Sequence, residues 1–232
     1  MNEDFKIMNL FSRISDFLLL NFLFIITSLP IITIGASVTA LYSVNLKMVK
    51  SEESYITREY FKAFRRNFKI ATPAFLFFLA TGALMSANIF ISFRAEGSFY
   101  LILRVLAGLL LLYLFICAKY YFPILARFDF TSRQIWMHIP HMIVTHAGSF
   151  LLIVLLNVPV VILMMYSIYT ALFVLIIGCI CGFAMFTYVE AFLFRKIFKN
   201  YELSTFWKIP GHTLKGRTLI EYCLLYLQKI LQ

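Results

Sequence analysis

The chain alternates between long uncharged apolar runs and short segments rich in lysine and arginine. Residues 17–46, 70–93 and 134–189 contain no Asp, Glu, Lys or Arg, and residues 99–122 contain only Arg104 and Lys119. A transmembrane helix needs about 20 apolar residues, and a charge at mid-depth costs about 2.5 to 3.5 kcal/mol on insertion scales. The pattern therefore predicts an all-α, polytopic transmembrane protein.

The run 134–189 is long enough for two spans, and its most polar stretch, residues 166–170, suits a turn at the interface. Composition supports a membrane protein, because 62% of the 232 residues are hydrophobic and 14% are charged, whereas about a quarter of a soluble domain is charged. We expect about five spans, near residues 17–34, 70–92, 99–122, 147–166 and 170–193.

The first run allows two arrangements, because residues 17–46 would form about 45 Å of helix, too long for one span and short for two. Pro30 and Gly35 divide it. In one arrangement the first span ends near Ile34 and a bent interfacial stretch follows. In the other, two half-length arms re-enter the membrane and the N-terminus lies inside. The first is favoured, because residues 1–16 lack the positive charge that holds a terminus inside.

Lysine and arginine then orient the spans, since cytoplasmic loops are enriched in both. Residues 47–69 hold seven of them, residues 119–133 hold three, and the segment from Arg195 onward holds seven. The opposite side has only Arg94 and Arg104. The sequence therefore predicts a plasma-membrane protein with a cytoplasmic C-terminus, a single membrane domain over residues 1–200 and a cytosolic tail over 201–232.

Two inner segments are predicted to form cytosolic, interfacial amphipathic helices. Residues 55–69 pair an aromatic stripe with a basic one at helical spacing, and residues 131–146 carry apolar positions at Ile135, Trp136 and Ile139. Such helices lie along anionic headgroups or dock on a partner. The expected lipid or partner contacts are Arg58, Phe61, Phe64, Arg65, Arg66, Phe68, Lys69, Arg127, Arg133 and Trp136.

A shift of about 75 residues aligns these two segments and the spans that follow them. It superimposes Arg58 on Arg133 and Phe61 on Trp136, and the order of elements is the same in both copies. We therefore interpret the chain as one leading span followed by a parallel two-span repeat, residues 55–122 and 131–194.

Little in the sequence points to catalysis. Lys119 and Glu190 should lie near the inner ends of their spans and form an ion pair. The spacing of His138, His141 and His146 does not place all three on one helix face, so we expect no metal site. No phosphate-binding loop of the G-x-x-x-x-G-K-[ST] type occurs. We expect neither an enzyme nor a cofactor.

The segment 28–42 is the most distinctive part of the sequence. Pro30 removes a backbone donor and forces a bend, and small residues follow it, which let a neighbouring helix approach closely. A packing seam is the favoured interpretation, and a broken helix that lines a substrate path is the alternative. The residues concerned are Pro30, Gly35, Ala36, Ser37, Thr39 and Tyr42.

Three stretches resemble the YesL family of bacterial membrane proteins, domain-of-unknown-function family 624. They are residues 29–42 (LPIITIGASVTALY), 60–69 (YFKAFRRNFK) and 121–128 (YFPILARF). With the span spacing, the resemblance covers about residues 8–200. The family has no assigned activity, and its members tend to be encoded beside carbohydrate ABC importers and sugar-responsive two-component systems.

The resemblance implies an accessory or regulatory protein of carbohydrate import or sugar sensing. Its expected partners are the lipid bilayer and either ABC transporter subunits or a sensor histidine kinase, and no nucleic acid. The alternative is a small stand-alone permease or channel, with the segment from Pro30 to Tyr42 lining the path.

Overall fold

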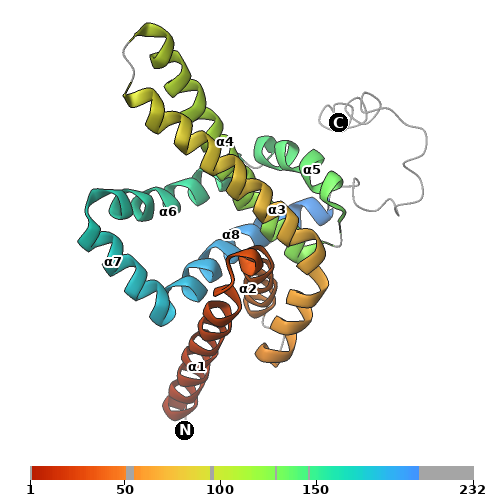
Figure 1. Cartoon of the computed structure of the whole chain (residues 1–232). Coiled ribbons are helices and arrows are strands. Elements are labelled where there is room, and N and C mark those ends of the chain that lie inside the picture. The colour runs from red at the N-terminus through yellow and green to blue at the C-terminus, as the bar shows by residue number, and fades with distance from the viewer. Residues whose placement is uncertain (1, 51–54, 95–96, 129, 146, 204–232) are drawn as a thin grey trace, which may run out of the picture. The chain divides into compact units, whose positions relative to one another are not determined.

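A computed structural model describes residues 2–50, 55–94, 97–128, 130–145 and 147–203 and is helical throughout these ranges apart from short turns (Figure 1). Two compact units divide the chain, Met1–Arg195 and Lys196–Gln232. From residue 204 onward, the expected tail 201–232 lies outside the described residues. The elements are α1 (Asn2–Ser28), η1 (Ile31–Thr33), α2 (Ile34–Val49), α3 (Ile56–Phe93), α4 (Ser98–Arg127), α5 (Ser132–Thr145), α6 (Ala147–Tyr166), α7 (Ile168–Ile177), the π-helical η2 (Gly178–Gly182) and α8 (Phe183–Leu203).

Several of these helices have the length and composition of membrane spans. Among the described residues, three stretches qualify alone: Ile31–Val49, Ile56–Phe93 and Ser98–Arg127. The α7–α8 pair qualifies only as a unit and bends by 80° at its break, so the expected span 170–193 is not one straight helix. The all-helical class is confirmed. Within the described ranges, three helices, or four if the bent pair counts as one span, are long and apolar enough to cross a membrane, against the expected five.

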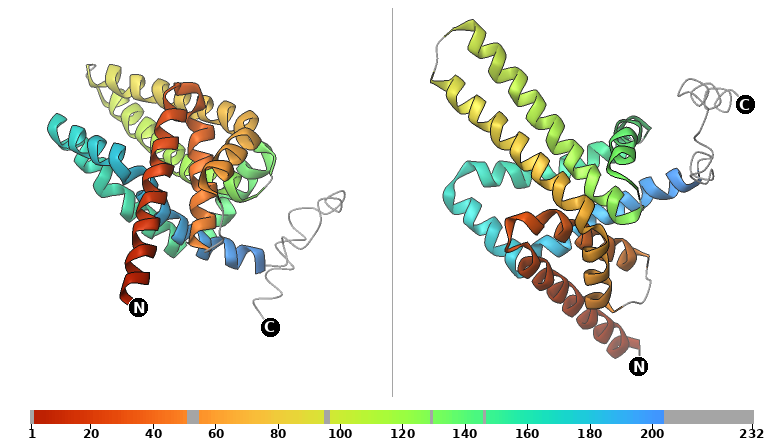
Figure 2. Two further views of the ribbon diagram at one scale, coloured as in Figure 1. Left: turned by 90° about the horizontal axis from the view of Figure 1, so that it is seen from below. Right: turned by 45° about the vertical axis from the view of Figure 1, so that its right-hand side comes forward.

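The first apolar run folds as a helical hairpin, which corrects the favoured arrangement. α1 ends at Ser28, before Pro30, because proline has no N–H and disfavours helix in the residue before it. The Thr33 hydroxyl donates to the Thr27 carbonyl at 2.6 Å and closes the turn. α2 then runs back beside α1 (Figure 2) and is buried along most of its length, so residues 34–46 are not a bent interfacial stretch.

α3 joins two elements that we expected to be separate. The predicted interfacial helix 55–69 and the predicted span 70–92 form one helix of 38 residues, about 57 Å long. Its first half is held by one buried face that packs mainly on α2. The members of this face are Ile56, Tyr60, Ala63, Asn67 and Ala71. Four of the five are small or polar-tipped, so a search for aromatic and basic stripes does not reveal the face.

The two expected repeat units differ in their helices. The single helix α3 of residues 55–122 corresponds to two helices, α5 and α6, in residues 131–194. Straight α4 likewise corresponds to the bent pair α7 and α8. A parallel repeat is therefore limited to the order of elements, because the breaks fall at different places.

α4 returns beside α3, and α5 packs on the C-terminal end of α4. Residues 120–126 of α4 are all buried. α5 covers them with its own buried side chains, which include Ile135, Ile139 and Met142. The Tyr121 hydroxyl lies 2.8 Å from the hydroxyl of Ser132 at the start of α5. α5 is thus docked on the α3–α4 pair by both apolar and polar contacts.

Candidate functional site

A basic face runs along the first half of α3. Five cationic side chains are exposed there: Arg58, Lys62, Arg65, Arg66 and Lys69. At about 100° per residue, Lys62 lies about 200° around the helix from the fully buried Tyr60. The protein therefore fixes one face of this segment in its core and presents the opposite, basic face outward.

The expected aromatic contacts are only partly available for a partner. Phe61 is 40% exposed, whereas Phe64 and Phe68 are half-buried, and Phe64 packs against the core formed by α1, α2 and α3. Arg66 extends toward the end of α4, its guanidinium 3.5 Å from the carbonyl of Ala126. In the same region Arg127 is half-buried and Arg133 is exposed.

Trp136 of α5 is half-buried and packs against aromatic rings of α3 and α4. Its ring centroid lies 5.5 Å from that of Phe78, 6.0 Å from that of Phe77 and 6.0 Å from that of Tyr121. Such aromatic pairs contribute about 0.5 to 1.5 kcal/mol beyond area burial. Trp136 therefore packs α5 on α3 and α4, and its expected contact with lipid or a partner stays a prediction for the part of the ring that remains exposed.

An ion pair links the end of α2 to the first turn of α3, at the edge of the basic face. The Lys47 ammonium lies 2.5 Å from the carboxylate of Glu59 and donates a hydrogen bond to it. Both side chains are partly exposed, so the pair adds little stability. Its effect is to neutralise Glu59, the one acidic residue in the first turns of α3.

A second polar site is buried where four helices meet. Glu190 of α8 is 1% exposed and accepts hydrogen bonds from three side chains. Lys119 Nζ of α4 lies 2.9 Å from Oε1, Asn157 Nδ2 of α6 lies 2.7 Å from the same oxygen, and the Tyr42 hydroxyl of α2 donates to Oε2. Lys119 is 24% exposed, so its ammonium is largely removed from solvent. We call these four residues the Glu190 cluster.

A third polar site surrounds the break between α7 and α8. Asn21 of α1 donates to the carbonyls of Gly178 and Cys179 at 3.0 and 2.8 Å and accepts from the Ala184 N–H at 3.1 Å. Asn45 of α2 donates to the Ala184 carbonyl at 3.2 Å. Both asparagines are fully buried. They replace helical hydrogen bonds that a π-helical break displaces.

The small-residue segment forms a packing seam. Gly35, Ala36, Ser37 and Thr39 are buried, while Pro30 is exposed at the hairpin turn. A Cβ added to Gly35 would lie 2.5 Å from the carbonyl oxygen of Ala71 and 2.6 Å from Cβ of Phe75. The backbones of α2 and α3 are therefore in close contact at Gly35, as a packing seam requires.

Substituting Gly35 with alanine is expected to destabilise the protein by about 1 to 3 kcal/mol, because α2 and α3 must separate. Thermal unfolding in detergent measures the change. Gly82→Ala on the same α3 is the matched control, since nothing lies within 4 Å of its added Cβ, and it should be neutral or stabilising by up to about 1 kcal/mol. Equal losses in the two variants would contradict the close contact at Gly35.

The histidines do not form a metal site in the described part of the chain. No group of three or more His, Cys, Asp or Glu side chains with suitable geometry occurs among the residues searched. His138 lies on α5, where its ring is half-buried. His146 and the side chain of His141 lie outside the described residues.

Comparison with known proteins identifies one family. No curated protein and no solved structure matches the chain. The sequence model of a family described as "Protein of unknown function, DUF624" matches residues 17–89. The match spans the second half of α1, the hairpin turn, α2 and most of α3, and therefore includes both the Gly35 seam and the basic face. Over these residues, about a third of the chain, the protein is similar to the DUF624 family.

Proposed function

We propose that the protein is a non-enzymatic accessory or regulatory component of carbohydrate ABC import or sugar sensing in the bacterial plasma membrane. The basic face of α3 is its contact surface for a cytosolic or membrane-embedded partner, either a transporter subunit or a sensor histidine kinase. The C-terminus lies in the cytoplasm. The N-terminus lies there too, because the α1–α2 hairpin returns the chain to the side on which it began.

The rigid display of five cations on one helix face carries this proposal. A helix that only floats on headgroups needs its apolar face free for lipid. In α3 that face is already used in the core, so the cations are held at fixed spacing from one another. Fixed spacing suits an acidic protein surface, for which charge complementarity sets both orientation and the rate of association.

Neutralising the face is the direct test. The triple variant R58Q/K62Q/R65Q removes three charges from the face. The amount of permease, ATPase or kinase that co-purifies with it from native membranes is expected to fall at least about tenfold relative to the wild type, since charged contacts across interfaces are worth several kcal/mol in total. The variant R58K/K62R/R65K keeps every charge and should retain the partner. Retention by the neutral variant, or the absence of any such partner from the wild type, would overturn the proposal.

The permease alternative is favoured by one observation, the polar residues of the Glu190 cluster inside an apolar protein. Buried ionisable residues in membrane proteins often mark substrate or ion pathways. Proteoliposomes that contain only this protein would take up a labelled mono- or disaccharide if this alternative is right, and Glu190→Gln would slow that uptake. Uptake equal to that of empty liposomes would exclude it.

A further inference from the structure

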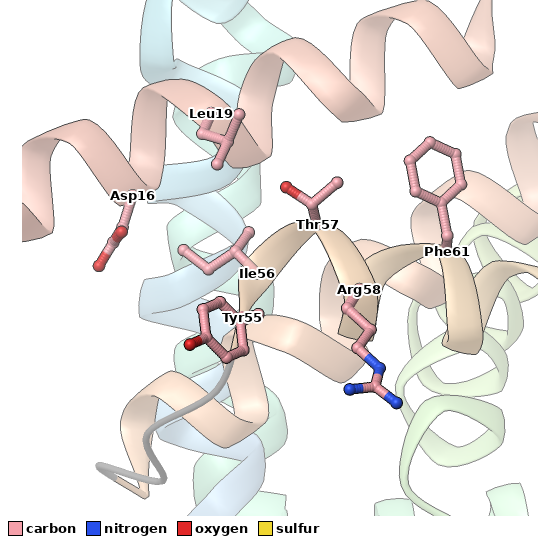
Figure 3. A pocket seen from close by; sticks show the side chains of 7 residues that line it. All are labelled: Asp16, Leu19, Tyr55, Ile56, Thr57, Arg58 and Phe61. Carbon is pink, nitrogen blue, oxygen red and sulfur yellow. The ribbon is translucent and has the colours of Figure 1, made fainter.

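A groove lies between α1 and the first turns of α3, beside the basic face. Its volume is about 560 Å³. Asp16 stands at one end on α1, and Arg58 and Phe61 stand toward the other on α3, with Tyr55 and Ile56 between them (Figure 3). The groove is lined by Asp16, Leu19, Tyr55, Ile56, Thr57, Arg58 and Phe61.

The groove carries opposite charges at separate places. Figure 3 shows the Asp16 carboxylate and the Arg58 guanidinium directed to the same side of the groove, on either side of the Tyr55 ring. Partial burial raises the pKa of Asp16, and the charge of Arg13, one turn earlier on α1, opposes this rise. A ligand that spans the groove therefore meets an acid on α1 and a guanidinium on α3.

An exposed apolar strip leads away from the charged residues. Leu19 in the groove is 42% exposed, and Phe22 and Ile26 continue along α1 at 60% and 46%. These positions are three and four residues apart, so they share one side of the helix, and they extend about 10 Å toward the hairpin turn. Phe61 is a further exposed apolar side chain of the groove.

We propose that this groove binds a phospholipid whose headgroup carries both a phosphate and a primary ammonium. Arg58 binds the phosphate, Asp16 binds the ammonium, and an acyl chain follows Leu19, Phe22 and Ile26. The apolar strip favours an intact lipid over a free headgroup, since only an intact lipid has an acyl chain that can pack along the strip while Arg58 and Asp16 bind its headgroup. The groove shares Arg58 and Phe61 with the expected partner contacts, whereas Lys62, Arg65 and Lys69 do not line it.

Lipid titrations of the purified full-length protein, followed by native mass spectrometry, test the site. The probes are phosphatidylethanolamine, phosphatidylcholine and phosphatidylglycerol with identical acyl chains. Phosphatidylethanolamine should bind about tenfold more tightly than phosphatidylcholine, because a trimethylated ammonium cannot donate hydrogen bonds to a carboxylate. Phosphatidylglycerol should also bind more weakly, because it offers Asp16 no cation.

Two variants and one control complete the experiment. Asp16→Asn should abolish the preference for phosphatidylethanolamine, and Arg58→Gln should weaken all three lipids. Lys62→Gln, on the basic face outside the groove, should leave the preference unchanged. A preference is a ratio within one protein sample, so a partial folding defect does not imitate its loss. Tighter binding of phosphatidylglycerol to the wild type, or an unchanged preference in Asp16→Asn, would overturn the proposal.

Discussion

Replacing Glu190 with alanine is expected to destabilise the folded protein by about 3 to 5 kcal/mol. That is the usual cost of removing one partner from a buried ion pair, because the other charge is left uncompensated. Here the loss strands the Lys119 ammonium and also removes the acceptor for Asn157 and Tyr42. Four helices meet at this carboxylate, so we expect the loss to appear as a single global shift of unfolding in a detergent titration.

The double variant E190L/K119M distinguishes the cost of an unpaired buried charge from the cost of lost packing, because it removes both charges and keeps similar side-chain volumes. Replacing a buried pair by apolar residues of similar volume is often neutral, so much of the lost stability should return. Glu59→Ala is the matched control, because its partner Lys47 is 35% exposed and such pairs contribute about 0 to 1 kcal/mol. If Glu190→Ala cost no more than Glu59→Ala, the Glu190 cluster would not hold the helices together.

Replacing Asn21 with leucine is expected to cost about 2 to 5 kcal/mol. The substitution keeps the size of the side chain but deletes three hydrogen bonds to the break between α7 and α8, each worth about 0.6 to 1.7 kcal/mol inside a membrane protein. A structural role at the break also predicts a local effect, because the Ala184 N–H loses its acceptor. Amide exchange at Ala184 should become much faster than exchange at residues of α2.

Asn88→Leu provides the comparison for Asn21→Leu. Asn88 is exposed near the C-terminal end of α3, and its side chain accepts a hydrogen bond from the Ser92 hydroxyl at 3.4 Å. The substitution Asn88→Leu should change the free energy of unfolding by less than about 0.5 kcal/mol. If exchange at Ala184 were equally slow in the wild type and in Asn21→Leu, the asparagine would not be what satisfies the break.

The sequence predicts some features of this protein well, because their signals are local. An uncharged run of about 20 residues indicates a helix without knowledge of its neighbours, so the bounds of α4 and α6 could be read closely. Pro30 likewise marks the turn between α1 and α2. Lys119 and Glu190 could be suggested as partners, since both are charges at the inner ends of apolar runs, and the structure separates Nζ and Oε1 by 2.9 Å.

Other features depend on contacts that no local pattern reveals. Asn21, Asn45 and Asn157 are uncharged and so pass unnoticed in a search for charges, although each lies in an apolar run. Their partners are between 33 and 158 residues away. One usable signal was present: Gly178 and Gly182 frame the break, where a Cβ on Gly182 would lie 2.8 Å from the Ile177 carbonyl oxygen. The packed face of α3 was hidden because alanine and asparagine form part of it.

The bond between Asn21 and the break also sets a constraint on biosynthesis. Asn21 and Gly178 are separated by 157 residues, and at about 5 to 20 residues per second the ribosome needs roughly 8 to 30 s to make that length of chain. Throughout this interval α1 exists without the carbonyls that its amide will bind. The Asn21 amide can therefore make these hydrogen bonds only after residues 178–184 have been synthesised, late in the production of the described helices.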